Sequence, residues 1–535
     1  MRDSFAVRRI LLLAVLALMG LNAFLFAARS ANPLVVADGW NAVDTVVRPA
    51  ATGEFHASDL FLKRAANDHS QPLRKLVLLF HYRYFDLDFS IESVIGLLFA
   101  CLNLALLWHF AFPNLGPLEG VPESVPGLVP QLGFAALAAV YLSPNATVVL
   151  SWPLLTLNYT SHAFMLVFLW AAWRALSSGG RLPLSIAFAA ALAMDVVTDD
   201  TGLVTTIAAT LAAAVHAWRQ RTWQRTVQVV AIVLAAYAVY ALGYRLLIPA
   251  PEHVVTGGAA RGLGLLLAQV PQAWKWAVIP LSSSVAHRSH SQAWFGAGAD
   301  EVQILLAVAV ALAHAWFWWR AFAAPRSSLA SFTGVAMMLV FYGLLAGIIL
   351  TRVGARGGSD YLWQPRYVMI YQWNLLALLL MGIDQVQASR GQAVRNATVQ
   401  AGTTILGVAA AGLLVLQIPF AVSAWGSLRF MSAYQQRMAF QIGAMAAQPA
   451  LVPEKCMPQI VICRYTPARR ARLLQFMRVH RLNLFSPSFQ ARNRLYPDMG
   501  TLSGLAPPGT HPPRPALRPG ALPGQPIKAA VPAVH

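Results

Sequence analysis

Long apolar stretches separated by short polar segments dominate the pattern of hydrophobic and polar positions along the chain. A helix needs about 20 apolar residues to cross the hydrocarbon core of a bilayer, so each stretch predicts a membrane-spanning helix. About eleven spans are predicted, at 8–28, 91–112, 128–143, 160–176, 183–198, 201–218, 227–248, 302–320, 329–350, 367–386 and 402–422. A cleaved signal peptide is the alternative interpretation of the first stretch, given its basic start.

Basic residues in the short connections predict the orientation, because Arg and Lys are retained on the cytoplasmic side of a membrane. They recur in alternate connections, for example as Arg174 and Arg181 and again as Arg320 and Arg326. A cytoplasmic N-terminus places all of them on one side. The segments then expected outside are 29–90, 249–300, 351–366 and everything after 423.

Three regions follow from this pattern: a membrane body at 1–423 with external loops at 29–90 and 249–300, a small external unit at 424–495, and a tail at 496–535. The tail is rich in Pro and Gly and lacks the apolar content to bury a core, so we expect it to be disordered. The external unit is predicted to be α/β, with two helices flanking a short strand at QIVICRY.

Both external loops are expected to have some structure of their own. In the first loop, surface helices are predicted to break at Gln71-Pro72, because proline disfavours a helical residue before it. In the second loop, Pro271 and Pro280 interrupt an apolar segment. We expect that segment to dip into the headgroup region without crossing; an additional span is the alternative.

Composition agrees with an integral membrane protein. Of 535 residues, 57% are hydrophobic and 11% charged, and the mean hydropathy is +0.54. The net charge of +19 is concentrated near the C-terminus, where a solvated tail near anionic lipid headgroups is expected and no nucleic-acid-binding motif is seen. Cys456 and Cys463 lie together on the predicted external side, where an oxidising compartment favours a local disulfide.

Acidic and histidine side chains gather in the first external loop. Asp38 follows the first span in the sequence DGW, where a carboxylate can act as a general base or hold a metal ion. Capping of a helix that begins at Trp40 is the alternative. Asp68 and His69 adjoin the proline turn and form a second candidate, for which a solvated loop with ordinary ion pairs is the alternative.

Cations near these acids are candidates for binding a phosphate. Arg74 and Lys75 follow the proline turn by about one helical turn. Arg366, in PRYVMIYQ, begins the tenth span from outside, where an arginine can pair with a lipid phosphate or simply snorkel to the interface.

Two further acidic groups are weaker candidates. Asp199 and Asp200, with Asp195 nearby, lie at the external end of the fifth span and form a possible secondary acidic site. Asp86 and Asp88 (FDLDFSIE) have DxD spacing, typical of some metal sites, but the alternation equally places both acids on the polar side where the second span begins.

These residues, in this order, resemble the GT-C superfamily of polytopic glycosyltransferases, which use polyprenyl-phosphate-linked sugars, and within it the bacterial group similar to protein O-mannosyltransferases and aminoarabinose transferases. Asp38 takes the place of the family's acid in the first external loop, and HSQPLRKLVLLF resembles the turn and helix that follow it. PRYVMIYQ, with Arg366 and Tyr367, resembles the start of a late span. HSQPL departs from the family's HPPL, and segment 144–159 lacks the acid that many members have, so a divalent metal ion stays open.

The resemblance implies an all-α, GT-C-like enzyme of the bacterial inner membrane, with its N-terminus cytoplasmic and its C-terminus periplasmic. It would transfer a sugar, with inversion, from a polyprenyl-phosphate donor to a glycan, lipid or protein acceptor. The implied catalytic residues are Asp38, Asp68 and His69, and the implied substrate-binding residues are Arg74, Lys75, Arg366 and Tyr367. A transporter or flippase of a lipid-linked glycan is the alternative. Transporters concentrate ionisable residues near the bilayer midplane, whereas here the acids lie in loops and at span ends, which favours the enzyme.

Overall fold

The structure is a computed structural model that describes residues 2–62, 70–113, 127–198, 200–248, 264, 266–323, 327–354, 358–389 and 397–495. Ten helical segments in these ranges are long and apolar enough to cross a membrane, and a shorter apolar helix covers Leu128–Tyr141. Together they overlap all eleven predicted spans, so the prediction of an all-α polytopic membrane protein is confirmed. The helices of the body are α1 (Arg2–Ser30), α5 (Ser90–Ala111), α6 (Leu128–Tyr141), α9 (Asn158–Ser178), α10 (Arg181–Thr198), α11 (Asp200–Gln220), α12 (Trp223–Leu247), α16 (Ala299–Ala323), α17 (Leu329–Ile348), α18 (Val368–Ala388) and α19 (Ala397–Gly426).

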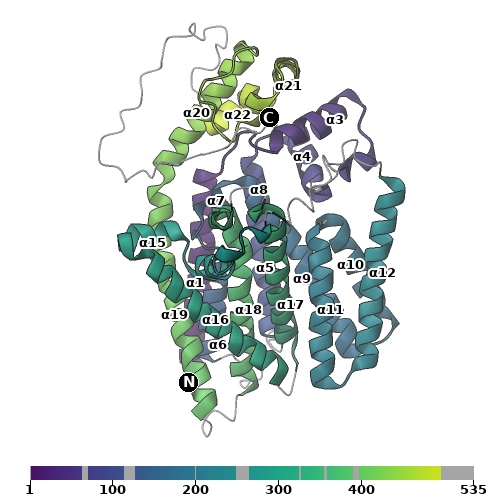
Figure 1. The fold of residues 1–535 in the computed structure, drawn as a ribbon, viewed down its shortest axis with the longest axis vertical. Coiled ribbons are helices and arrows are strands. Elements are labelled where there is room, and N and C mark those ends of the chain that lie inside the picture. The colour runs from purple at the N-terminus through teal and green to yellow at the C-terminus, as the bar shows by residue number, and fades with distance from the viewer. Residues whose placement is uncertain are drawn as a thin grey trace.

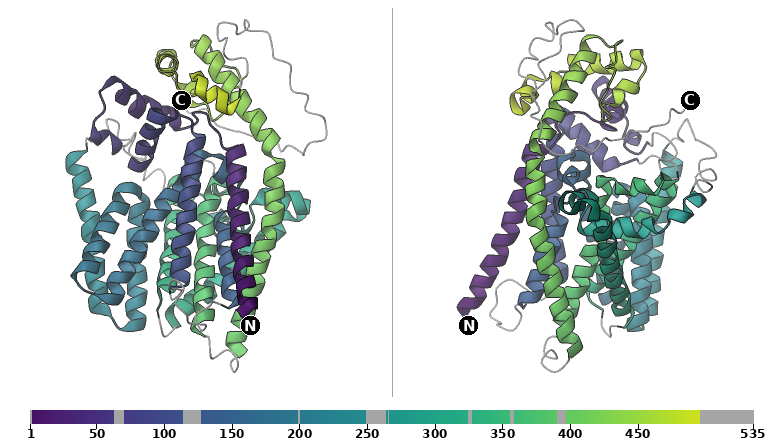
Figure 2. Two further views of the ribbon diagram at one scale, coloured as in Figure 1. Left: turned by 180° about the vertical axis from the view of Figure 1, so that it is seen from behind. Right: turned by 60° about the vertical axis from the view of Figure 1, so that its left-hand side comes forward.

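The body is a bundle in which these helices run roughly along one axis (Figure 1). Its centre is α18, which packs against α17 and α6 and is mostly buried. A side-chain carbon added at Gly334 would lie 3.3 Å from the backbone oxygen of Ala377, so a small residue lets α17 and α18 approach closely. The N-terminus lies at one end of the bundle, and the helices of the first loop (29–90) and the C-terminal helices lie at the other (Figures 1 and 2).

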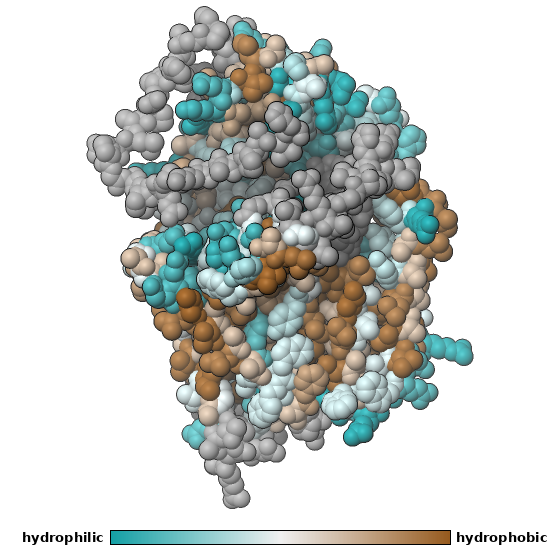
Figure 3. All heavy atoms as spheres, in the orientation of Figure 1, coloured by the Kyte–Doolittle hydropathy of each residue, from teal (hydrophilic) through white to brown (hydrophobic). Residues whose placement is uncertain are grey.

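Apolar side chains also cover much of the outside of the bundle (Figure 3). Leu21 on α1, Val239 on α12 and Val408 on α19 are all more than half exposed. A water-soluble protein rarely exposes apolar surface on this scale, whereas a lipid-facing surface requires it. Hydrophilic residues gather toward the two ends of the body, as expected where a bundle leaves the hydrocarbon (Figure 3).

The end of the bundle opposite the N-terminus carries the shorter elements. From the first loop these are α2 (Gly39–Ala42), the π-helical η1 (Val43–Val47), α3 (Arg48–Thr52), η2 (Ala57–Leu60) and α4 (Pro72–Tyr84). From the C-terminal region they are α20 (Leu428–Ala447), η9 (Val461–Arg464), α21 (Pro467–Val479), η10 (Asn483–Phe485) and α22 (Pro487–Asn493). The remaining short elements are α7 (Thr147–Ser151), α8 (Pro153–Thr156), η4 (Val270–Gln272), α14 (Lys275–Val285), α15 (Arg288–Phe295), η5 (Gly296–Gly298), η6 (Ile349–Val353), η7 (Ser359–Trp363) and η8 (Pro365–Tyr367).

A second apolar core joins the first loop (29–90) to the C-terminal region. Trp40, Val43 and Phe89 of the loop are buried in one cluster with residues of the C-terminal region such as Ile442 and Phe489. The unit predicted at 424–495 therefore shares its core with the loop 29–90. The predicted tail at 496–535 lies outside the described residues.

The structure corrects the predicted strand at QIVICRY. No residue in the described ranges is in a strand, and Val461–Arg464 form the 3-10 helix η9. Arg470, which is buried, donates hydrogen bonds from Nη1 to the carbonyl oxygens of Ile462, Cys463 and Tyr465. One guanidinium thus satisfies the backbone acceptors that a neighbouring strand would otherwise satisfy, so the segment folds without a sheet.

The prolines of the loops at 29–90 and 249–300 differ in their positions relative to helices. Gln71 is left-handed, with φ of 47°, and α4 begins at Pro72, so the predicted break in the first loop is confirmed. Pro280 lies inside α14, so the predicted interruption of the second loop at that residue is wrong. Pro271 lies at the start of η4.

Candidate functional site

A cavity of about 1090 Å³ is lined by residues of the first loop (29–90) and by the adjoining ends of the bundle helices. The loop contributes α2, η1 and the start of α4 to the lining, and the bundle contributes residues of α11, α17, η6 and η8. Its volume is at the upper end of the range of cofactor and ligand sites. Asp38, Arg74, Lys75, Arg366 and Tyr367, which the sequence nominates, all line it.

Asp38 lies on the loop side of this cavity, directly before α2. Its side chain is exposed and makes no capping hydrogen bond to that helix, so helix capping does not account for the residue. The preceding residue, Ala37, has a left-handed φ of 47°, and its N–H donates a 2.7 Å hydrogen bond to the carbonyl oxygen of Gln459. Asn41 and Thr45 follow on the same side and also line the cavity. We call the segment from Asp38 to Thr45 the acidic wall.

Arg352 and Arg366 supply positive charge to the cavity from η6 and η8. We call these two arginines, with Tyr367, the cationic wall. The Arg366 guanidinium donates to the hydroxyl oxygens of Tyr361 and Tyr367, and its carbon lies 5.6 and 5.1 Å from the centroids of their rings. Two tyrosines therefore orient this arginine by hydrogen bonding and by cation–π attraction. Sequence reasoning missed Arg352, although the basic residues of TRVGARGG, in a predicted external connection, were a usable signal.

Segment 351–366, which carries the two arginines of the cationic wall, is supported by residues of the second loop (249–300). Lys275 forms a 2.9 Å ion pair with Asp360, and the indole N–H of Trp276 donates a 2.9 Å hydrogen bond to Ser359 Oγ. His287 Nε2 lies 2.9 Å from the carbonyl oxygen of Trp363, and burial lowers the pKa of His287. A neutral imidazole with one N–H can donate that bond, so the contact does not require protonation.

Arg74 and Lys75 line the cavity from α4 but have different surroundings. Lys75 Nζ donates hydrogen bonds of 2.9 and 2.6 Å to the carbonyl oxygens of Asp59 and Leu62. Arg74 Nη1 donates a 3.1 Å hydrogen bond to the Gln71 side chain. Lys75 therefore fastens the segment around η2 to α4.

The part of the cavity that is lined by the bundle helices is mainly apolar. Val204 of α11, Leu344 and Ile348 of α17 and Ile370 of α18 line this part. A side-chain carbon at Gly343 would lie 2.6 Å from Val204 Cγ1, so α17 and α11 approach closely there. One space thus combines charged groups from the first loop and from the ends of α17 and α18 with apolar groups from the membrane helices. Such a space suits an amphipathic ligand with an anionic head and a hydrocarbon tail.

Several nominated residues cannot be placed in this cavity. Asp68, His69 and Asp199 lie outside the described residues, and the side chain of Asp200 is likewise not described. Asp195 is buried and accepts a 3.2 Å hydrogen bond from Thr206, and it does not line the cavity. Within the described ranges, no three His, Cys, Asp or Glu side chains come together as a metal site.

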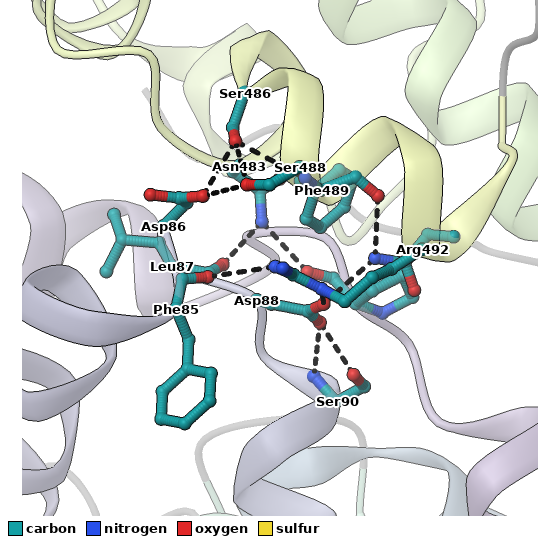
Figure 4. A network of polar contacts seen from close by, with 12 residues as sticks. Phe85, Asp86, Leu87, Asp88, Ser90, Asn483, Ser486, Ser488, Phe489 and Arg492 are labelled. Atoms are coloured by element: carbon teal, nitrogen blue, oxygen red, sulfur yellow. Dashed lines mark hydrogen bonds and ion pairs between the residues drawn. The ribbon is translucent and has the colours of Figure 1, made fainter.

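The DxD acids have protein partners (Figure 4). Asp86 accepts hydrogen bonds from the hydroxyls of Ser486 and Ser488, the first over 2.8 Å. Asp88 accepts from Arg492 Nε over 3.1 Å and from the Asn493 side chain over 2.9 Å. These partners are all donors of the C-terminal region, so we assign Asp86 and Asp88 to docking that region onto the loop.

Cys456 and Cys463 form a disulfide, with their Cα atoms 6.5 Å apart. The loop that it closes contains Gln459, whose carbonyl oxygen accepts the hydrogen bond from Ala37 beside Asp38. The disulfide therefore belongs to a segment that directly supports the acidic wall.

No protein-family model matches this chain, and no curated protein and no solved structure matches it.

Proposed function

We propose that this protein transfers a sugar from a polyprenyl-phosphate donor to an acceptor of the cell envelope, at the external face of a bacterial inner membrane. The observation that carries the proposal is that one amphipathic cavity is lined by a carboxylate, Asp38, and by two arginines, Arg352 and Arg366. The GT-C resemblance of DGW and PRYVMIYQ points to the same chemistry.

In this mechanism the isoprenoid chain lies along the apolar part of the cavity, beside Val204 and Ile348, and its phosphate pairs with Arg352 and Arg366. Arginine suits this role because its planar guanidinium donates two parallel hydrogen bonds to phosphate and stays charged. The tyrosines that hold Arg366 preorganise it for the phosphate.

Asp38 acts on the acceptor. Its carboxylate takes the proton of an acceptor hydroxyl as that oxygen bonds to the anomeric carbon from the face opposite the phosphate. The bond between the anomeric carbon and the phosphate oxygen breaks at the same time, with inversion, and its electron pair leaves on the polyprenyl phosphate. The negative charge that develops on the leaving phosphate is stabilised by the two arginines.

Transport of a lipid-linked glycan without covalent chemistry is the competing function. Purified protein in detergent, incubated with a panel of polyprenyl-phosphate sugars and envelope acceptors, distinguishes the two. A new glycosidic product, with free polyprenyl phosphate released in equal amount, supports the transferase. Movement of the intact lipid-linked sugar across proteoliposomes, with no product from any donor, overturns it.

A further inference from the structure

Beside the apolar core that the C-terminal region shares with the acidic wall, Arg469 on α21 makes polar contacts to that wall. Its Nε donates a 2.8 Å hydrogen bond to Oδ2 of Asp44, and its Nη2 donates a 3.2 Å hydrogen bond to Oδ1 of Asn41. Asp44 is buried and also pairs with Arg48 over 3.2 Å, and Asn41 lines the cavity. Arg469 also makes a cation–π contact with Tyr465, since its guanidinium carbon lies 4.0 Å from the centroid of the Tyr465 ring.

This contact occurs where the backbone of the wall needs outside support. The wall lies in a helical run from Gly39 to Thr52, which α2, the five-residue π-helix η1 and α3 form without a break. A helix of about this length is only marginally stable by itself, and π-helical turns are rare and found mainly at functional sites. Gln459 holds the start of this segment through Ala37, and Arg469 holds its middle through Asn41 and Asp44.

We infer that Arg469 is a positioning residue for the transfer reaction, which sets the acidic wall so that Asp38 and Asn41 face the bound donor. The inference rests on the proposed function. Arg469 does not line the cavity, so it acts through Asn41 and Asp44. Displacement of a reacting group by about 1 Å can reduce a rate on the order of a hundredfold, so a contact of this kind can control catalysis without touching substrate.

The chain offers matched controls for this inference. Arg472 lies on the same helix, α21, and is exposed. Arg492 docks α22 onto Asp88, away from the cavity. Arg469→Ala removes the contacts to the wall, and Arg469→Lys keeps the charge but not the forked geometry.

The experiment compares transfer kinetics with hydrogen exchange in these variants of the full-length protein. Arg469→Ala should lower kcat on the order of tenfold with little change in the donor KM, because the cationic wall is untouched. Arg469→Lys should recover part of this loss, and Arg472→Ala should behave as wild type. Amides of residues 38–48 should exchange faster in Arg469→Ala than in wild type, and not in Arg492→Ala.

Two results overturn the inference. One is unchanged kcat and unchanged exchange at 38–48 in Arg469→Ala. The other is an equal loss of kcat and equally faster exchange at 38–48 in Arg492→Ala, which would make the effect one of docking in general. If the wild-type protein transfers no sugar, the proposed function fails by itself. The exchange data still decide whether Arg469 holds the wall.

Discussion

Asp88 and Arg492 connect two distant parts of the chain: Arg492 Nε donates a 3.1 Å hydrogen bond to Oδ2 of Asp88, which ties α22 to the turn before α5. Asp88 is almost fully buried, and it also accepts hydrogen bonds from Asn493 and Ser90. The C-terminal region is thereby fixed on the same loop that carries Asp38.

Replacing Asp88 by Ala should therefore destabilise the docked C-terminal region. Charge-assisted hydrogen bonds contribute about 1.5–3 kcal/mol each, but Arg492 is partly exposed, so we expect a total loss of about 2 kcal/mol. A lower midpoint of thermal unfolding in detergent checks this. Asp300→Ala is the matched control, because Asp300 pairs with Arg288 but is mostly exposed and should change stability little. Equal effects of the two substitutions would contradict the docking role.

His81 gives the same region a dependence on pH. It is fully buried on α4, with Glu92 Oε1 3.7 Å from its Nδ1, and burial lowers its pKa to about 4 despite the favourable charge of Asp88. As the pH falls below 6.5, His81 binds a proton in the unfolded chain before it does so in the folded protein, and this favours unfolding. The folded state therefore keeps its full stability above pH 6.5 and loses the part that depends on neutral His81 as the pH falls toward 4. The total loss is about 3 kcal/mol.

Unfolding midpoints of wild type and His81→Gln, measured from pH 7 to pH 4.5, test this expectation. The other titratable groups are common to both proteins, so the difference between the two curves reports on His81. The wild type should lose more stability than the variant over this range. Parallel curves would show that His81 does not titrate as its burial requires.

Arg366→Ala should chiefly weaken donor binding. Loss of a charge-assisted contact to phosphate costs about 1.5–3 kcal/mol, which is on the order of tenfold or more in affinity. A titration with a polyprenyl-phosphate sugar measures the change. Arg245→Ala is the control, because Arg245 is an exposed arginine in the last turn of α12 and does not line the cavity. Unchanged affinity in Arg366→Ala would make Arg366 an interfacial anchor.

The orientation of the bundle is tested by reporter fusions. Because the acidic and cationic walls line one cavity, their segments must face one compartment, and the basic connections predict that this is the external one. Alkaline phosphatase fused after residues 60, 360 and 440 should be active, and after 220 and 395 inactive. The reverse pattern would place the cavity on the cytoplasmic side and remove the proposed periplasmic chemistry.

The membrane body could be predicted from sequence because apolar length is a physical requirement of the bilayer, and all eleven predicted spans have a counterpart. The turn at Gln71-Pro72 could also be predicted from the sequence, because proline restricts the backbone of the residue before it. The 3-10 helix in place of the predicted strand at QIVICRY could not be predicted, because it depends on Arg470, a few residues later, folding back from α21 to bind the carbonyl groups of this segment. The pattern of apolar residues does not reveal such a contact.

In the candidate site, too, some residues could be predicted from the sequence and others could not. Asp38 and Arg366 were nominated from their positions beside spans and from a family resemblance, and both line the cavity. The DxD spacing of Asp86 and Asp88 resembles a metal motif. The spacing does not reveal that both carboxylates accept hydrogen bonds from serine, asparagine and arginine side chains far along the chain. Arg469 was missed for the same reason: its role depends on where α21 docks.

The most direct test of the central claim compares Asp38→Asn with wild type in two assays on the same preparations, donor binding and sugar transfer. The substitution keeps the shape of the side chain and removes the carboxylate that would take the acceptor proton. We predict unchanged donor affinity, because the cationic wall is intact, together with loss of transfer. Transfer near the wild-type rate would contradict the assignment of Asp38 as the base and, with it, the proposed mechanism.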